Sequence, residues 1–291
     1  MPHAPVVVCD PGIDDLLALL VLVGAGDPPS AVVGTAGNID AGLAYRNATG
    51  IVELLGLDCP VAQGSQTGLS GPYRDIGEPF HGSDGLGGIG SALPVTPQTR
   101  QMLDPLSLIS GSVLATGPLT VVAQALAIGQ PISDLVWMGG AISDGGNMTA
   151  LAEFNAWLDP EAADQVLSSA VPIAMVPLDV THQVPLDRSD LEDMGTLGEL
   201  AALAARSCIY LHDQHGHVYP HDAVAAVAQM NPELFGWDER WVRCELSGTW
   251  TRGMTVVDRR EHGEIGFVRV AHSVQAAAVK ERIFEALRTL G

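Results

Sequence analysis

The sequence predicts an α/β fold in which helices flank a mostly parallel central sheet. Short apolar runs recur along the 291 residues, and most of them are followed by Ala- and Leu-rich stretches with helical spacing. These runs are Pro5 to Cys9, Ala31 to Thr35, Leu106 to Ala115, Asp134 to Met138 and Pro172 to Val176. Strands that alternate with helices favour parallel pairing, because each helix returns the chain to the same end of the sheet.

Composition indicates a single domain that covers residues 1–291. Apolar residues make up 47% of the chain and charged residues only 16%, so a sizeable core can be buried. No internal repeat or low-complexity segment marks a domain boundary. The run from Leu16 to Val23 is predicted to be a buried helix, since it is far shorter than the roughly 20 residues needed to cross a bilayer. Val274 to Leu290 also has helical spacing.

The charge balance argues against nucleic acid and membranes as partners. Lys and Arg number 14 against 34 Asp and Glu, a formal charge of -20 that repels phosphate-rich polymers and anionic lipid. Solubility is the simplest role of this acidity, although a local carboxylate cluster can still hold a cation. The cysteines Cys9, Cys59, Cys208 and Cys244 form no C-x-x-C pair, which favours buried free thiols in a reducing compartment. Since the N-terminus has no signal-peptide features, we expect a cytoplasmic protein.

Polar residues that follow the predicted strands are the first candidates for a ligand site, because parallel sheets bind ligands beyond the carboxyl ends of their strands. Asp10, Asn38 and Thr120 hold such positions. Asp10 also begins the sequence DPGIDD, in which Asp14 and Asp15 add two more carboxylates at a strand-to-helix junction. Carboxylate oxygens are natural ligands of a hard divalent cation. Helix capping would explain Asp14 and Asp15 without a ligand, but it explains Asp10 less well.

Two further groups of polar residues precede predicted helices. Asn147, Glu153 and Asn155 can converge before a helix that begins near residue 159, although a hydrogen-bonded loop would also explain them. His221 and Asp222 precede a later helical run, and a histidine beside a carboxylate can titrate near neutrality. A helix cap and a surface histidine are the simpler explanation of that pair taken alone.

The segment from Gly68 to Pro97 is dense in Gly, Ser and Pro and contains FHGSDGLGG. It is predicted to be a long surface loop. Loops of this length within a domain are often functional lids, and flexible connectors are the alternative.

Several short motifs occur in an order that resembles the inosine-uridine-preferring nucleoside hydrolase family. They are DPGIDD, AGN at 36–38, GPLT at 117–120, MGG at 138–140, AEFN at 152–155, the late HD and TRGMTVVD at 251–258. DPGIDD and AEFN together are quite specific, whereas GPLT, MGG and HD are weak singly. The resemblance implies a Rossmann-like nucleoside hydrolase fold and a homodimer or homotetramer. It also implies calcium-dependent hydrolysis of the N-glycosidic bond of ribonucleosides, in purine and pyrimidine salvage, with a broad or pyrimidine-tolerant base preference.

The resemblance also implies a calcium site and a catalytic base. Asp10, Asp15, Asp222 and the backbone carbonyl of Thr120 would bind one Ca²⁺, together with a water and two ribose hydroxyls. The cation would lower the pKa of that water, and Asp10 would accept its proton.

The remaining family roles concern the sugar and the base. Ribose hydroxyls would contact Asp14, Asn147, Glu153 and Asn155, with Asn38 near the water and the sugar. His221 matches the general acid for the departing base.

Other histidines offer weaker candidates around the base. His81 would lie near the leaving base, while Tyr210, His212, His215 and His217 would help to close the pocket. Solvated surface histidines explain these residues equally well.

One departure from the family pattern is Val8, where the family usually has an acidic residue two positions before Asp10. Because outer-shell partners change metal affinity or activity by about 10- to 100-fold, Val8 puts rate and calcium affinity in doubt. A non-catalytic calcium-dependent ribose-binding protein of the same fold is therefore one alternative. A metal-dependent phosphohydrolase is another, but no Lys or Arg follows Asp10 before Arg46 to bind a phosphate.

Overall fold

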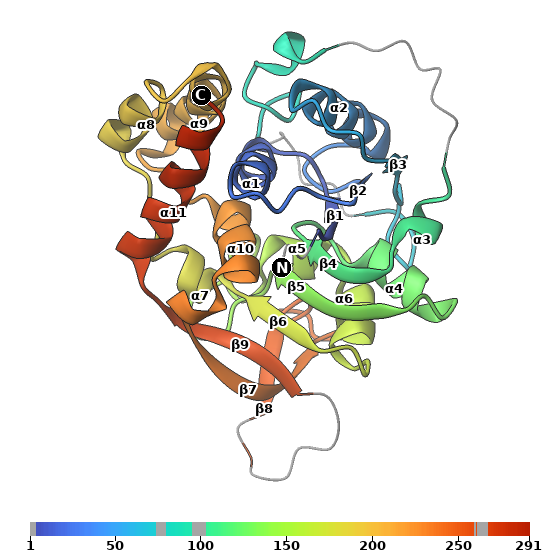
Figure 1. The fold of residues 1–291 in the computed structure, drawn as a ribbon. Coiled ribbons are helices and arrows are strands. Elements are labelled where there is room, and N and C mark those ends of the chain that lie inside the picture. Colours follow the sequence, from blue (N-terminus) through green and yellow to red (C-terminus); the bar gives the residue numbers. More distant parts are fainter. Residues whose placement is uncertain (1–3, 74–79, 95–102, 259, 261–266) are drawn as a thin grey trace.

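The structure is a computed structural model that describes residues 4–73, 80–94, 103–258, 260 and 267–291, and a nine-stranded sheet runs through these residues (Figure 1). The strand order is β3-β2-β1-β4-β5-β6-β9-β7-β8. The strands are β1 (Val6–Cys9), β2 (Ala31–Gly34), β3 (Val61–Gln63), β4 (Gly111–Ala115), β5 (Ile132–Met138), β6 (Ile173–Val176), β7 (Phe235–Cys244), β8 (Thr255–Asp258) and β9 (Phe267–Val274). Strands β1 to β6 and β9 pair in parallel, which confirms the predicted fold class.

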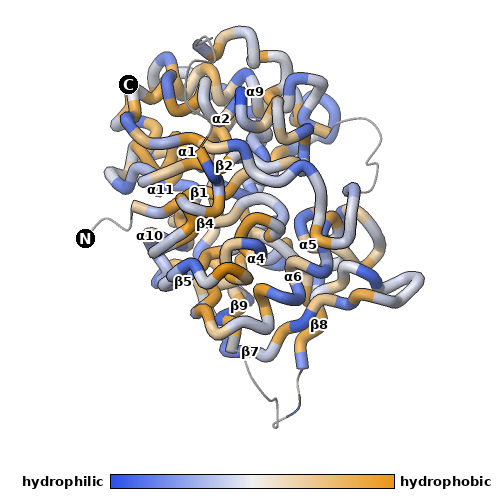
Figure 2. Tube along the Cα trace, turned by 90° about the vertical axis from the view of Figure 1, so that its right-hand side faces the viewer, coloured by the Kyte–Doolittle hydropathy of each residue, from blue (hydrophilic) through white to orange (hydrophobic). Residues whose placement is uncertain are grey.

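Helices cover both faces of this sheet. They are α1 (Ile13–Gly24), α2 (Ala41–Leu54), α3 (Pro105–Leu108), α4 (Thr120–Ala127), α5 (Phe154–Leu158), α6 (Pro160–Leu167), α7 (Leu178–Thr181), α8 (Arg188–Met194), α9 (Glu199–His215), α10 (His221–Met230) and α11 (Ala276–Thr289), with 3-10 turns at Gly90–Ala92 and Pro232–Leu234. One apolar core joins the sheet to α1, α2 and α8 to α11, and a second joins the other face to α4 and α6. The tube of Figure 2 is largely orange, and so hydrophobic, around β1 and β4.

The apolar run from Leu106 to Ala115 is not one strand, and that part of the prediction was wrong. Its first residues belong to α3, which Asp104 caps by accepting a hydrogen bond from the Leu106 backbone N–H at 3.0 Å. Gly111 has φ +69°, a conformation that side chains disfavour, and β4 begins there. Apolar content alone does not distinguish a short buried helix from a strand.

The predicted strands did not include the antiparallel end of the sheet. β7 pairs antiparallel with β8 and with β9, and β9 joins this hairpin-like end to the parallel β6. Among the described residues, no helix is both long enough and apolar enough to span a bilayer.

Residues 68–73 and 80–94 of the predicted surface loop are described, and the longer of these two parts, 80–94, is bound to the body of the protein. Asn47 donates to the Asp84 carbonyl at 2.8 Å, and Ser207 donates to the Leu86 carbonyl at 2.7 Å. Leu86 is fully buried. Since these contacts come from α2 and α9, the segment, which includes His81, is packed rather than a free surface loop. Residues 74–79 and 95–97 of the predicted loop lie outside the described residues.

Candidate active site

A cavity of about 550 Å³ lies beyond the carboxyl ends of β1, β4 and β5. Most of the side chains predicted to act on a substrate line it together. They are Asp10, Asp14, Asn38, His81, Asn147, Glu153, Asn155, His221 and Asp222. These residues come from five separate parts of the chain, so the fold rather than local sequence brings them to one place.

A backbone hydrogen bond orients Asp10 at the base of the cavity, and two glycines leave room for its side chain. Its Oδ2 accepts the backbone N–H of Asn38 at 2.7 Å, while its Oδ1 is buried and has no hydrogen-bond partner. A Cβ on Gly37 would lie 1.9 Å from Asp10 Oδ2, and one on Gly117 would lie 2.9 Å from Oδ1. Burial raises the pKa of Asp10 well above its usual value, and the charge of Asp15 raises it further.

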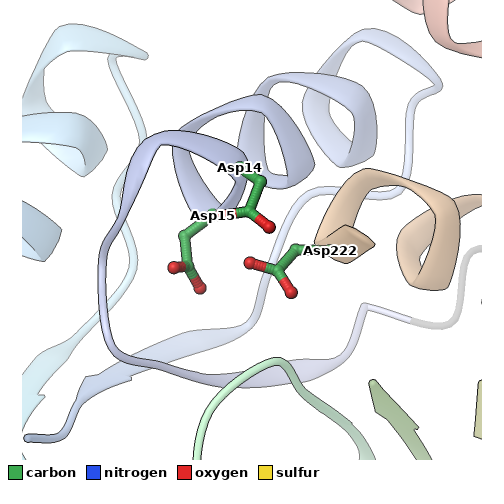
Figure 3. Close-up of side chains that lie close together, drawn as sticks. All are labelled: Asp14, Asp15 and Asp222. Carbon is green, nitrogen blue, oxygen red and sulfur yellow. The ribbon is translucent and has the colours of Figure 1, made fainter. Parts of the chain in front are cut away.

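Three more carboxyl groups lie side by side next to Asp10. Asp14 and Asp15 project from the start of α1, and Asp222 projects toward them from the start of α10 (Figure 3). One oxygen of each lies within 4.8 Å of the others. Burial raises the pKa of Asp14 and of Asp15 to about 6 and that of Asp222 well above its usual value. We call Asp10, Asp14, Asp15 and Asp222 the acidic cluster.

The acidic cluster has the chemistry of a cation site. Its donors are all oxygens, which hard divalent cations prefer. The described residues that line the cavity include no Lys or Arg, so no basic side chain there neutralises the cluster. The unpartnered Asp10 Oδ1 is an acceptor that burial would otherwise leave unsatisfied. The cluster therefore fits a bound metal ion. Asp14, which was predicted to contact ribose, is one of the three carboxylates of the cluster that lie closest to one another.

The structure places Thr116, not Thr120, beside these carboxylates. Thr116 follows β4 directly, lines the cavity and donates its hydroxyl to Asp15 Oδ1 at 2.7 Å. Thr120 begins α4, on the opposite face of the sheet from α1, and its hydroxyl bonds to Asp159 Oδ2 at 2.6 Å and to the Tyr73 hydroxyl at 2.7 Å. Thr120 is not among the residues that line the cavity, so the structure lends no support to its backbone carbonyl as a calcium ligand.

The AEFN segment supplies polar groups opposite the acidic cluster. Glu153 caps α5 and accepts backbone N–H groups from Gly140 at 2.7 Å and from Asn155 at 2.9 Å. Burial raises the pKa of Glu153, and these hydrogen bonds oppose that rise. Asn155 donates to the carbonyls of Thr116 and Met138 at 2.9 and 3.0 Å, which leaves its buried Oδ1 without a partner. That oxygen is free to accept a hydrogen bond from a ligand hydroxyl.

Of the two histidines predicted to act near the base, His81 is buried and His221 is partly buried. Burial lowers the pKa of His81 to about 4 and that of His221 to about 3. His81 Nδ1 accepts the backbone N–H of Ile13 at 3.0 Å, so its proton resides on Nε2. His221 Nδ1 is hydrogen bonded to the Thr181 hydroxyl at 2.7 Å.

Aromatic and imidazole side chains form the other wall of the cavity, and only some of them were predicted from the sequence. His215 and His217 line it as predicted, whereas Tyr210 packs behind the 80–94 segment and His212, like Tyr210, is not among the lining residues. The lining residues that were not predicted include Phe80, Met148, Phe154, His182 and Tyr219. Phe80 stacks on His215 with ring centroids 4.5 Å apart. The dense run of His and Tyr just before His221 was the available signal for Tyr219, but His182 stands alone in the sequence and gave none.

Val8, the departure from the family pattern, lies in an apolar environment. It is fully buried, belongs to the core that joins the sheet to α4 and α6, and is paired with Val33 and Ala115 on the neighbouring strands. Valine is therefore compatible with its neighbours on the adjacent strands, which are apolar.

Comparisons with known proteins agree with this site. The family model for inosine-uridine preferring nucleoside hydrolase matches residues 6–281. The chain is 34% identical over 281 residues to the pyrimidine-specific ribonucleoside hydrolase RihA of Salmonella typhimurium, covering 87% of this chain and 88% of that protein. It is 37% identical over 276 residues to the RihA of Shewanella oneidensis, covering 86% and 85%.

Solved structures give the same result. A plant nucleoside hydrolase, the PpNRh1 enzyme, matches with a TM-score of 0.87 and 28% identity over 99% of both chains. A purine-preferring ribonucleoside hydrolase from Gardnerella vaginalis matches with a TM-score of 0.86 and 25% identity over 98% of both chains. The chain therefore belongs to the inosine-uridine preferring nucleoside hydrolase family and is a nucleoside hydrolase.

Proposed function

We propose that this protein is a calcium-dependent enzyme that hydrolyses the N-glycosidic bond of ribonucleosides, with pyrimidine nucleosides among its substrates. The observation that carries the proposal is the cavity itself, which is lined by Asp10, Asp14 and Asp222 of the acidic cluster at one end and by a wall of rings at the other. Ribose hydroxyls suit the first end and a planar base suits the second. The names of the RihA relatives support a pyrimidine preference. We also propose that residues 1–291 work as one domain.

We assign the calcium ligands to Asp10, Asp15 and Asp222, with Thr116 replacing Thr120 as the candidate for a backbone carbonyl. Thr116 is supported by its place at the end of β4 and its hydrogen bond to Asp15. A bound cation would supply positive charge that keeps the carboxylates ionised and lowers the pKa of a coordinated water. Within the protein, Asp10 is the acceptor for that water's proton, because its Oδ1 has no other partner.

The sugar is held by the polar groups around the acidic cluster. Asp14, Asn147, Glu153 and Asn155 are assigned to its hydroxyls, and Asn38, whose backbone N–H orients Asp10, is assigned to the water and sugar side. Fixing the ribose in this way favours a geometry in which water attacks the anomeric carbon as the bond to the base breaks.

The base leaves toward His81 and His221. Bond breaking leaves negative charge on the base, which ultimately takes up a proton. Because burial lowers the pKa of His221 to about 3, it meets the base as a neutral imidazole and stabilises the developing charge through an N–H hydrogen bond. His81, with its proton on Nε2, can act in the same way.

Nucleoside salvage in the cytoplasm is the setting that we propose. Cys9, Cys59, Cys208 and Cys244 are all buried and free, which is consistent with a reducing compartment. Assembly as a homodimer or homotetramer stays a prediction, which analytical ultracentrifugation would check.

The alternatives drawn from the sequence are less well supported. A phosphohydrolase needs a basic side chain near its phosphate, and the described lining of the cavity has no Lys or Arg. A binding protein inactivated by Val8 is disfavoured, because Val8 packs among apolar residues.

Measurement of free ribose tests the proposal. Purified protein is incubated separately with uridine, cytidine, inosine and adenosine, with excess calcium, with a chelator and as the Asp10→Asn variant. We expect ribose release from the pyrimidine nucleosides that both the chelator and the substitution abolish. Absence of ribose from all four nucleosides in excess calcium would reject the proposed function.

A further inference from the structure

The catalytic assignments above do not use His182, one of the histidines of the cavity. His182 directly follows α7 and lines the cavity. Its ring lies against Tyr219, with centroids 4.7 Å apart, and against His221, with centroids 5.5 Å apart. Since His221 is assigned to the departing base, these contacts place His182 on the base side of the cavity rather than beside the acidic cluster.

His182 is paired with Asp144, and this pair is held from both sides. His182 Nδ1 lies 3.1 Å from Asp144 Oδ2. The backbone N–H groups of Ile142, Ser143 and Asp144 donate to the Asp179 carboxylate at 2.8, 2.7 and 3.2 Å. Asp179 belongs to α7, so these bonds fix the segment that carries Asp144 to the helix that precedes His182.

The pairing determines which hydrogen bond His182 can offer to a ligand. An ionised carboxylate only accepts, so Nδ1 of His182 carries the proton that the two groups share. In a neutral imidazole the other nitrogen, Nε2, is then an acceptor. His182 therefore differs from His81, whose Nε2 is a donor. The cavity thus combines a donor and an acceptor among its imidazoles.

We propose that His182, oriented by Asp144, is a specificity-determining residue whose Nε2 accepts a hydrogen bond from an N–H group on the edge of the base. This inference rests on the proposed function, because it assigns the base side of that cavity. Uracil offers N3–H and cytosine its exocyclic amino group, whereas the ribose carries no N–H. A base whose N–H is blocked leaves the acceptor unpaired and is discriminated against.

The test compares uridine with N3-methyluridine in wild type and in His182→Phe. Phenylalanine keeps a ring of similar size, so any steric effect of the methyl group persists while the hydrogen bond is lost. We expect kcat/KM for uridine to fall by about fivefold to tenfold in the variant, with N3-methyluridine nearly unchanged. Equal loss for both substrates would reduce His182 to a packing residue and overturn the proposal. So would an effect that disappears with 5′-deoxyuridine, because it would assign His182 to the sugar.

Two further variants separate orientation from general damage. Asp144→Ala keeps His182 but removes the carboxylate that places its proton on Nδ1. We expect this variant to lower the preference for uridine over N3-methyluridine, and the change in the logarithm of that preference to be about half of the change caused by His182→Phe. His272→Phe is the matched control, because His272 also faces a carboxylate, Asp238 at 3.8 Å, but lies outside this cavity. We expect His272→Phe to leave the preference unchanged, and a shift equal to that of His182→Phe would overturn the proposal.

Equilibrium binding separates this inference from the proposed function. If wild type releases no ribose, the proposed function fails, and calorimetric titration of both nucleosides with calcium then tests His182 alone. A uridine preference that His182→Phe removes would support the inference. No preference, or no binding of either nucleoside, would refute it.

Discussion

Buried acids at the two ends of the sheet are stabilised in opposite ways. At the antiparallel end, Asp164 accepts two hydrogen bonds from Arg243 and one from the Cys244 backbone N–H at 3.1 Å. Beyond β1 and β4, the acidic cluster has no Lys or Arg among the described residues that line its cavity. A buried carboxylate without a cationic partner is costly, which favours the proposed bound cation at the cluster, whereas the contacts of Asp164 with Arg243 and Cys244 explain that residue without a ligand.

Asp10→Asn should have opposite effects on turnover and on the stability of the metal-free protein. We expect Asp10→Asn to lower kcat by about 10³-fold, because a general base contributes roughly 10² to 10⁴. In metal-free protein it should raise stability by about 1 kcal/mol, since it removes a buried group whose ionisation burial already opposes. Ribose release and thermal melts in chelator measure the two effects. A variant that loses both turnover and metal-free stability would show that Asp10 is structural, as Asp164 is.

Gly37→Ala should damage the acidic cluster without removing any of its groups. The added Cβ would lie 1.9 Å from Asp10 Oδ2, so the carboxylate must move. Because misplacement of a catalytic group by about 1 Å costs about 10²-fold, we expect kcat to fall by that factor. Gly195→Ala is the control, since the nearest atom to its Cβ is the Glu192 carbonyl oxygen at 3.3 Å. Similar losses in the two variants would count against a role for the position of Asp10.

The same contrast explains how much the sequence could predict. DPGIDD was recognisable because its carboxylates lie at a strand-to-helix junction, and the late HD because it begins a helix; the fold brings these two helix starts together. Thr116 was missed because it directly precedes the GPLT motif, whose own threonine is Thr120, and only the fold decides which of the two threonines stays at the edge of the sheet. His182 was missed because its partner Asp144 is distant in sequence.

The strands show a similar limit. Parallel strands β1, β2 and β6 are short and apolar throughout, and the buried part of β5, Leu135 to Met138, is apolar too, so composition predicts them. β7 mixes charged and aromatic residues in its sequence FGWDERWVRC, because much of that strand is only partly buried. Its pairing with β9 joins residues that are separated by tens of positions, which local patterns do not encode.

Calcium should stabilise the acidic cluster in a pH-dependent manner. The pKa of Asp14 and of Asp15 rises from 3.8 to about 6 on folding, so the metal-free protein holds extra protons between these values. Its stability is therefore fully present below pH 3.8 and falls as pH rises through about 6. A cation binds the ionised carboxylates and should offset this loss by about 2.7 kcal/mol at 100 times its Kd.

Calorimetric melts at pH 5 and pH 7.5, with and without calcium, measure this difference. We expect a larger rise in Tm at pH 7.5, because at pH 5 protons compete for the same oxygens. Asp222→Asn should abolish the rise at both values. An equal rise in Tm at pH 5 and pH 7.5 would place the bound calcium away from these carboxyl groups.

The smallest effect is expected at Asp164. Substitution there tests whether a buried acid that is paired with an arginine contributes to stability alone. Asp164→Asn keeps one acceptor for the Cys244 N–H but removes the charge that pairs with Arg243. The Arg243 side chain is 44% exposed, so water screens the lost attraction, and we expect a loss of only about 1 kcal/mol in the free energy of unfolding by urea. Because this pair lies on the opposite face of the sheet from α1 and α10, ribose release should not change. A fall in kcat comparable to that of Asp10→Asn would mean that the paired acid also supports the reaction, and the distinction between paired structural acids and unpaired functional ones would not hold in this protein.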